Sequence, residues 1–115
     1  MKIEIDLPEK VSTNEIYAGK HWTVRKKHKD DWRLIVKAAC KGKKPIKEYP
    51  VDLYFLFYLT GRRFDTGNCS YMCKLIEDGL VHIGILENDS VKYVNIWHID
   101  PPSRGKTDRC VVDIV

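Results

Sequence analysis

Residues 51–59 read Val51-Asp52-Leu53-Tyr54-Phe55-Leu56-Phe57-Tyr58-Leu59, and this stretch decides the fold class. It is rich in β-branched and aromatic residues, which favour strands over helices. It is apolar on both faces, as strands in the middle of a sheet are, so we predict a central strand here. The stretch belongs to the longest apolar run of the chain, and it is far shorter than the ~20 residues that a membrane-spanning helix needs.

Two helices are predicted on either side of this strand. The first covers residues 22–41, because apolar residues recur there at helical spacing and Gly42 follows as a C-terminal cap. The second covers residues 69–81 and has an apolar face. That face consists of Cys69, Met72, Cys73, Ile76 and Leu80.

Three further strands complete the predicted order β-α-β-α-β-β. Residues 2–7 alternate with period 2 and end at Pro8, and strands are also expected over residues 91–99 and 109–115. Residues 101–105 would form a hairpin loop between the last two strands. Residues 12–22 are expected to be a loop, with Trp22 as a core anchor. The fold class is therefore α+β, with a small mixed sheet and two helices.

Length and composition are typical of one globular domain over residues 1–115. With 43% apolar and 31% charged residues, the chain is neither disordered, collagen-like nor a solenoid. The first residues alternate charge, unlike a signal peptide, so we expect a cytoplasmic protein that does not act at a membrane.

The net charge of +4 conceals two oppositely charged blocks. Residues 20–47 hold eleven Lys or Arg and two Asp, whereas residues 65–89 hold one Lys and five acids. This arrangement predicts one segment that binds a polyanion and another that binds a cation.

The acidic block supplies candidate metal ligands on three different predicted elements. Asp65 follows the central strand, Asp78 lies on the second helix, and Asp89 with Glu87 lies in the next turn. Converging carboxylates repel one another, and a divalent cation such as Mg²⁺ or Mn²⁺ relieves that repulsion. Lys74 lies one turn before Asp78, where it would form a surface ion pair or stabilise a scissile phosphate. Solvated surface acids remain the alternative.

The basic block supplies candidate DNA contacts. A stripe of positive charge runs along the first helix, and two arginines follow the central strand close to Asp65, so an acidic polymer would reach the metal. A solvated helix face is the alternative. The predicted DNA-binding residues here are Arg25, Lys26, Lys29, Arg33, Lys37, Arg62 and Arg63.

The cysteine spacing argues against a metal or disulfide site, and the absence of nucleotide-binding motifs argues against a nucleotide cofactor. Cys40, Cys69, Cys73 and Cys110 contain no C-x-x-C pair and are expected to be buried reduced thiols. The chain has no P-loop, G-x-G-x-x-G, G-x-S-x-G or H-E-x-x-H motif, so we expect no nucleotide cofactor.

Three short runs together resemble the RusA family of bacterial and prophage Holliday junction resolvases. They are Phe64-Asp65-Thr66-Gly67-Asn68, then Lys74 with Ile76-Glu77-Asp78-Gly79-Leu80, then Gly84-Ile85-Leu86-Glu87-Asn88-Asp89-Ser90. Leu7-Pro8, Asn14 and His21-Trp22 are also similar to the family's opening. The resemblance implies a homodimeric, Mg²⁺-dependent endonuclease that cuts four-way or branched DNA in recombination and repair.

The resemblance also implies residue roles. Asp65, Asp78 and Asp89 would be catalytic and metal-binding, Glu87 would assist as a ligand, and Lys74 would be the essential lysine. Asn68 matches the asparagine that closes the first motif and would contact DNA. Gly67 stands where the family has its second aspartate, which leaves full activity in question, and whether Glu77 or Glu87 replaces that carboxylate stays open. Asn88 replaces an acid. Lys74 lies three residues further from Asn68 than in short family members, which is nearly one helical turn.

Three functional hypotheses follow. The first is the metal-dependent junction endonuclease. The second is a DNA-binding member of the same fold whose catalytic site is weakened. The third is an unrelated small domain whose basic helix contacts RNA or an acidic protein.

Overall fold

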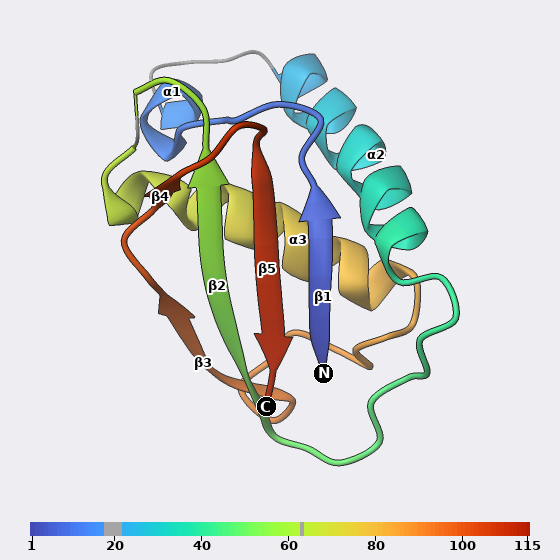
Figure 1. Cartoon of the computed structure of the whole chain (residues 1–115). Helices are drawn as coiled ribbons and strands as arrows, with labels where there is room; N and C mark the ends of the chain where they lie inside the picture. Colours follow the sequence, from blue (N-terminus) through green and yellow to red (C-terminus); the bar gives the residue numbers. More distant parts are fainter. Residues whose placement is uncertain (18–21, 63) are drawn as a thin grey trace.

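The chain folds into one mixed β-sheet with its helices on one face, as the computed structural model shows (Figure 1). The structure describes residues 1–17, 22–62 and 64–115. In chain order the elements are β1 (Lys2–Asp6), α1 (Thr13–Tyr17), α2 (Trp22–Ala39), β2 (Val51–Leu59), the 3-10 helix η1 (Thr66–Cys69), α3 (Ser70–His82), β3 (Val94–Ile99), β4 (Ser103–Arg104) and β5 (Arg109–Ile114). The predicted α+β class is confirmed, and α1, η1 and β4 are additional elements.

β2 is the central strand, as predicted. It pairs with β5 in antiparallel orientation on one side, and β1 pairs antiparallel with the outer edge of β5. On its other side β2 pairs in parallel with β3 along residues 51–55 and with β4 at Tyr58 and Leu59. The two short strands β3 and β4 therefore succeed each other along the same edge of β2.

The predicted hairpin at residues 101–105 is wrong, because β2 lies between β3 and β5 in the sheet. The segment instead crosses the end of β2, where the Gly105 N–H donates to the Leu59 carbonyl at 3.0 Å. A Cβ on Gly105 would lie 2.9 Å from the Tyr58 Cβ, so glycine permits this close passage. Proline and glycine indicate a turn here, whereas residues 103–104 form β4, and turn residues do not specify which strand is the neighbour.

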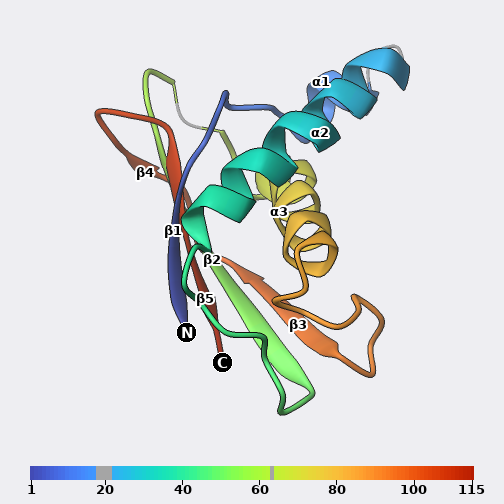
Figure 2. The same ribbon diagram turned by 90° about the vertical axis from the view of Figure 1, so that its right-hand side faces the viewer.

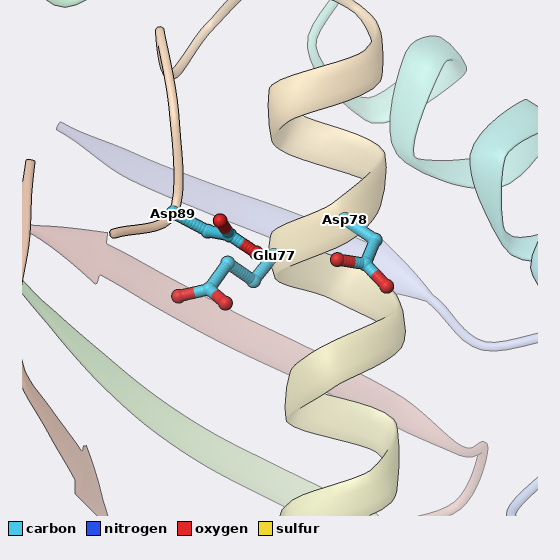
Figure 3. Close-up of side chains that lie close together, drawn as sticks. All are labelled: Glu77, Asp78 and Asp89. Carbon is cyan, nitrogen blue, oxygen red and sulfur yellow. The ribbon is translucent and has the colours of Figure 1, made fainter. Parts of the chain in front are cut away.

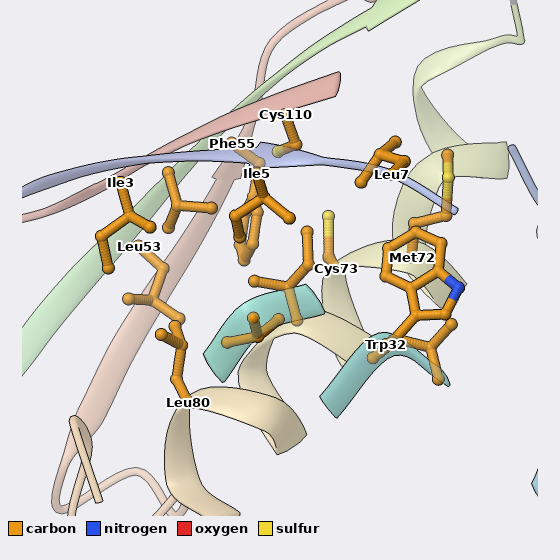
Figure 4. Close-up of a cluster of buried hydrophobic side chains, with 14 of the residues drawn as sticks. Ile3, Ile5, Leu7, Trp32, Leu53, Phe55, Met72, Cys73, Leu80 and Cys110 are labelled. Carbon is orange, nitrogen blue, oxygen red and sulfur yellow. The ribbon is translucent and has the colours of Figure 1, made fainter. Parts of the chain in front are cut away.

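Helices α2 and α3 cover one face of the sheet (Figure 2). Alternate residues of β1, β2 and β5 point toward them and are buried, whereas the opposite face is partly exposed. The core between the layers includes Trp32, Phe55, Met72 and Leu80 (Figure 4). The expectation that β2 is apolar and buried on both faces therefore holds for one face only, since Tyr54 is 40% exposed.

Trp22 is not the predicted core anchor, because its side chain is 67% exposed at the first position of α2. Trp32 takes that role and is fully buried. Trp22 and Trp32 are ten residues apart. Since each residue of a helix turns by about 100°, Trp22 lies roughly 80° around the helix axis from Trp32, away from the buried face. The region predicted to be a loop over residues 12–22 also contains α1.

Gly79 sets the distance between α2 and α3. A Cβ at this position would lie 3.0 Å from Cγ2 of Val36, so the two helices approach each other closely there. On the same side of the molecule, His28 of α2 contacts Tyr71 of α3, with 3.2 Å between His28 Nδ1 and the Tyr71 hydroxyl. These contacts fix the helix that carries the acidic residues described below.

The four cysteines are buried and unpaired, which confirms the predicted buried thiols. Within the described part of the chain, no helix is both long and apolar enough to cross a membrane.

Candidate active site

Lys74 lies at the centre of an acidic group. Its ammonium Nζ is 2.6 Å from Asp89 Oδ2, 3.2 Å from Glu77 Oε1 and 3.2 Å from Asp78 Oδ1. Three carboxylates thus share a single cation, which leaves the group with two formal negative charges in excess.

The three acids come from two elements. Glu77 and Asp78 follow Lys74 on α3 by three and four residues, so helical geometry brings them close to it. Asp89 reaches them from the segment between α3 and β3 (Figure 3). One oxygen from each carboxylate lies within 4.8 Å of the others. Oxygen atoms at such separations can contact one small cation together.

Glu77 is the buried member of the group, with only 3% of the residue exposed. Its Oε2 accepts a hydrogen bond from Trp97 Nε1–H at 2.7 Å, and its Oε1 faces Lys74. Trp97 in turn packs edge-on against Phe55, with 5.8 Å between the ring centroids. Strand β3 therefore holds the Glu77 carboxylate in a fixed orientation beneath the exposed acids.

Asn88 holds the loop that carries Asp89. Its Oδ1 accepts hydrogen bonds from the N–H groups of Asp89, at 2.7 Å, and Ser90, at 3.2 Å. This side-chain-to-backbone pattern is an Asx turn, which asparagine and aspartate both form. Asn88 thus performs a structural role that does not require a carboxylate at this position.

The pKa shifts of the group follow from burial and from these contacts. Burial lowers the pKa of the Lys74 ammonium, but the hydrogen bonds to Asp89, Glu77 and Asp78 outweigh it, so the pKa is raised overall. Burial raises the pKa of Glu77, opposed by the bonds from Trp97 and Lys74. The hydrogen bond from Lys74 lowers the pKa of Asp89. Lys74 is therefore a firmly held cation at neutral pH.

Asp65 does not join this acidic group. It precedes η1 near the end of β2, whereas Asp78 is the ninth residue of α3, and eight residues of α-helix rise about 12 Å. Lys74 is the fifth residue of α3, so it also lies about one turn along the helix axis from the end near Asp65. The expectation that Asp65 joins Asp78 and Asp89 does not take this axial separation into account.

Asp65 and Asn68 instead line a separate hollow of about 560 Å³ between the N-terminal segment and the start of α3, with Asn14 and Arg62 also in its wall. Thr13 of the N-terminal segment connects this segment to η1 and α3, because its hydroxyl lies 3.1 Å from the Asn68 carbonyl and accepts the Tyr71 N–H at 2.9 Å. Two of the predicted site residues are therefore close to each other but apart from Lys74.

Glu87 also lies outside the acidic group, although it belongs to the same loop as Asp89. Its backbone N–H donates to the Tyr49 hydroxyl at 2.9 Å, and the residue is exposed. Of the predicted metal ligands, the structure brings together Asp78 and Asp89, and it adds Glu77.

The basic stripe on α2 carries less free charge than its sequence suggests. Lys26 pairs with Asp30 at 2.8 Å and Lys27 with Asp31 at 2.7 Å, each one turn apart. Arg25 Nη2 donates to the Ile16 carbonyl of α1 at 3.3 Å. Lys29 and Lys37 are exposed, and Arg33 is half-buried. Arg62 lies in the hollow near Asp65, and Arg63 lies outside the described residues.

Trp97 is not among the predicted site residues, and Glu77 is only an open alternative for the carboxylate absent at Gly67. Glu77 follows Cys73 by four residues and precedes Leu80 by three, which places a charged residue on the apolar face of its helix. An acid at such a position is a signal of a buried, partnered carboxylate. Nothing in the sequence indicates that Trp97 is its partner, because that contact depends on the pairing of β3 with β2.

No protein-family model matches this chain, and neither does any curated protein.

Proposed function

We propose that this chain is a divalent-metal-dependent endonuclease acting on branched DNA. The observation that carries the proposal is the group of three carboxylates around Lys74, built from Glu77, Asp78 and Asp89. The resemblance to RusA resolvases supplies the reaction class, and two of the three acids and the lysine are residues that the resemblance implies.

The donor set is suited to Mg²⁺ or Mn²⁺. Both ions prefer carboxylate oxygens, and Mg²⁺ is held in proteins by a few carboxylates with water completing its coordination. Glu77, Asp78 and Asp89 would hold the ion. Such an ion polarises a phosphate and promotes attack by water on phosphorus.

The side chains of the protein have distinct roles in this proposal. Trp97 orients the Glu77 carboxylate, and Asn88 orients Asp89 through the loop backbone. The Lys74 ammonium contacts one oxygen of each of the three carboxylates that would hold the ion, so it would compete with the ion for them. Beside a bound phosphate, its positive charge would stabilise the transition state.

Basic residues on α2 would hold the duplex arms. Lys29, Arg33 and Lys37 recur at helical spacing along this helix, as a surface that follows a phosphate backbone requires. A four-way junction has approximate two-fold symmetry, so paired incision would use two copies of the chain. The protein would then work in the cytoplasm, where recombining DNA is found.

A second candidate function, DNA binding without efficient cleavage, is favoured by the position of Asp65. This residue lies apart from the acidic group, and Gly67 offers no carboxylate beside it. A chain with these features could recognise the same DNA while hydrolysing it slowly.

A cleavage assay separates these functions. A labelled four-way junction and a linear duplex are incubated with the protein in Mg²⁺, Mn²⁺ or EDTA. We expect cleavage of the junction, only with metal, and loss of it in Asp89→Asn. Glu87→Gln is the matched control, because it neutralises an acid of the same loop outside the group. Asp65→Asn reports whether the separate hollow also contributes.

Each outcome distinguishes among the hypotheses. Tight junction binding without cleavage by the unaltered protein supports the second function. Equal binding of junction, duplex and RNA supports the unrelated binding domain. Cleavage by Asp89→Asn at the unaltered rate contradicts the proposed site.

A further inference from the structure

A groove lies at the end of the helical layer where α2 and α3 both finish. It has a volume of about 720 Å³, and most of its exposed lining is apolar. Aliphatic side chains from the two helix ends form the apolar part of its lining, here called the floor. These residues are Leu34, Ala38, Ile83 and Ile85.

Local chain geometry builds this groove. Leu34 and Ala38 lie one turn apart on the outer side of α2, and Leu34 is 69% exposed. Gly84, with φ of +84°, turns the chain directly after α3 and so leaves an isoleucine on each side of the turn. The Ile85 carbonyl accepts the Ile46 N–H at 2.9 Å, which ties this turn to the segment before β2. The groove is therefore framed by ordered backbone.

The charged part of the groove lining, here called the rim, is positive. Lys37, Lys41 and Lys43 all line it, and no acid does. None of the three forms an ion pair with another residue of the described chain, in contrast to Lys26 and Lys27 of α2. An apolar floor and a cationic rim together specify an occupant that is apolar on one side and anionic at its edges.

We propose that this groove binds an acidic amphipathic peptide segment of another protein. A large apolar side chain of the peptide would fill the floor beside Leu34, and flanking carboxylates would pair with Lys41 and Lys43. Helix-in-groove binding commonly combines apolar anchors with edge charges in this way. A DNA backbone would satisfy the lysines but would bring no apolar group for the floor. The inference is independent of the proposed nuclease activity.

Selection from a random peptide library tests the inference without assuming a sequence. The unaltered chain is the target, and Leu34→Asp is the counter-selection target, because it places a negative charge on the floor while leaving the lysines. We expect the enriched peptides to carry at least one large apolar residue flanked by acids. The inference is overturned by a lack of enrichment, or by enriched peptides without acids.

Binding of one enriched, fluorescein-labelled peptide is then measured by anisotropy. We expect Leu34→Asp and the double variant Lys41→Glu/Lys43→Glu each to weaken it at least about tenfold. Lys29→Glu is the charge control on the same helix outside the groove and should have little effect. Circular dichroism melting of each variant excludes unfolding as the cause.

Two other occupants would overturn the inference in recognisable ways. Duplex DNA could displace the peptide. If DNA binding then depends on Lys41 and Lys43 but not on Leu34, the groove belongs to a DNA-binding surface. If light scattering shows a dimer that Leu34→Asp dissociates, the groove is covered by a second copy of the chain.

Discussion

At the scale of single residues, Lys74 decides how the acidic group behaves. Its ammonium contacts three carboxylates that would otherwise repel one another. The same ammonium competes with any divalent ion for those oxygens. The lysine therefore stabilises the folded chain and opposes ion binding at the same time.

Replacing Lys74 by Met should strengthen ion binding at the three carboxylates, even though under the proposed function it would abolish cleavage. Removing a positive charge at contact distance should tighten Mn²⁺ binding about tenfold, measured by electron paramagnetic resonance titration. Lys92→Met is the control, because Lys92 lies near the following strand and contacts Tyr93 instead. Weaker Mn²⁺ binding in Lys74→Met would contradict the competition.

The hydrogen bond between Trp97 and Glu77 should contribute measurably to stability. Trp97→Phe removes the N–H donor and keeps an aromatic ring against Phe55, so the loss should be about 1.5–3 kcal/mol, as for hydrogen bonds to charged groups. Urea denaturation measures it. In a Glu77→Met background the same substitution should cost less, and equal costs in both backgrounds would rule out the coupling.

At the scale of elements, the contact between α2 and α3 depends on Gly79. Gly79→Val should destabilise the chain by at least about 2 kcal/mol, because its side chain would overlap Val36. In combination with Val36→Ala the loss should be smaller than the sum of the two single losses. Gly67→Ala is the control, since an added Cβ there meets nothing within 4 Å. Additive losses in chemical denaturation would show that the two positions are not in contact.

The sequence predicts the elements better than their neighbours. Periodicity places β2 correctly, and it places α2 and α3 to within two residues at each end. It fails for the strand pairing around Pro101 to Gly105, because turn residues do not specify which strand a chain rejoins. It also fails for Trp22, since large aromatic residues are not always on the buried face of a helix.

The candidate site shows the same division between local and distant contacts. The proximity of Lys74 to Asp78 follows from helical spacing alone, and the structure reproduces it at 3.2 Å. Asp89 also joins them as predicted. The exclusion of Asp65 depends on distance along the helix axis, which a residue count gives once the helix is known. The inclusion of Trp97 depends on sheet pairing and does not follow from sequence spacing.

At the scale of the whole molecule, the sheet and helices share one core, and all four thiols lie in it. Cys40 directly follows α2, Cys69 is the last residue of η1, Cys73 lies in the first turn of α3, and Cys110 is on β5. Cys69, Cys73 and Cys110 are fully shielded from solvent. Thiols from both layers are therefore exposed together only when the layers separate.

Thiol labelling should consequently report global unfolding. Burial raises the pKa of Cys69 to about 11 and raises the pKa values of the other three thiols as well, so at pH 8 the native chain holds few thiolates. Unfolded cysteines have a pKa of about 8.5 and react readily with Ellman's reagent as thiolates.

We expect almost no reaction of the native chain and release of four equivalents in guanidinium chloride. Because labelling requires opening of the core, Gly79→Val should react about tenfold faster for each roughly 1.4 kcal/mol of stability that it loses, whereas Gly67→Ala should react at the rate of the unaltered chain. Rapid native labelling of Cys73 or Cys110 would contradict the shared core.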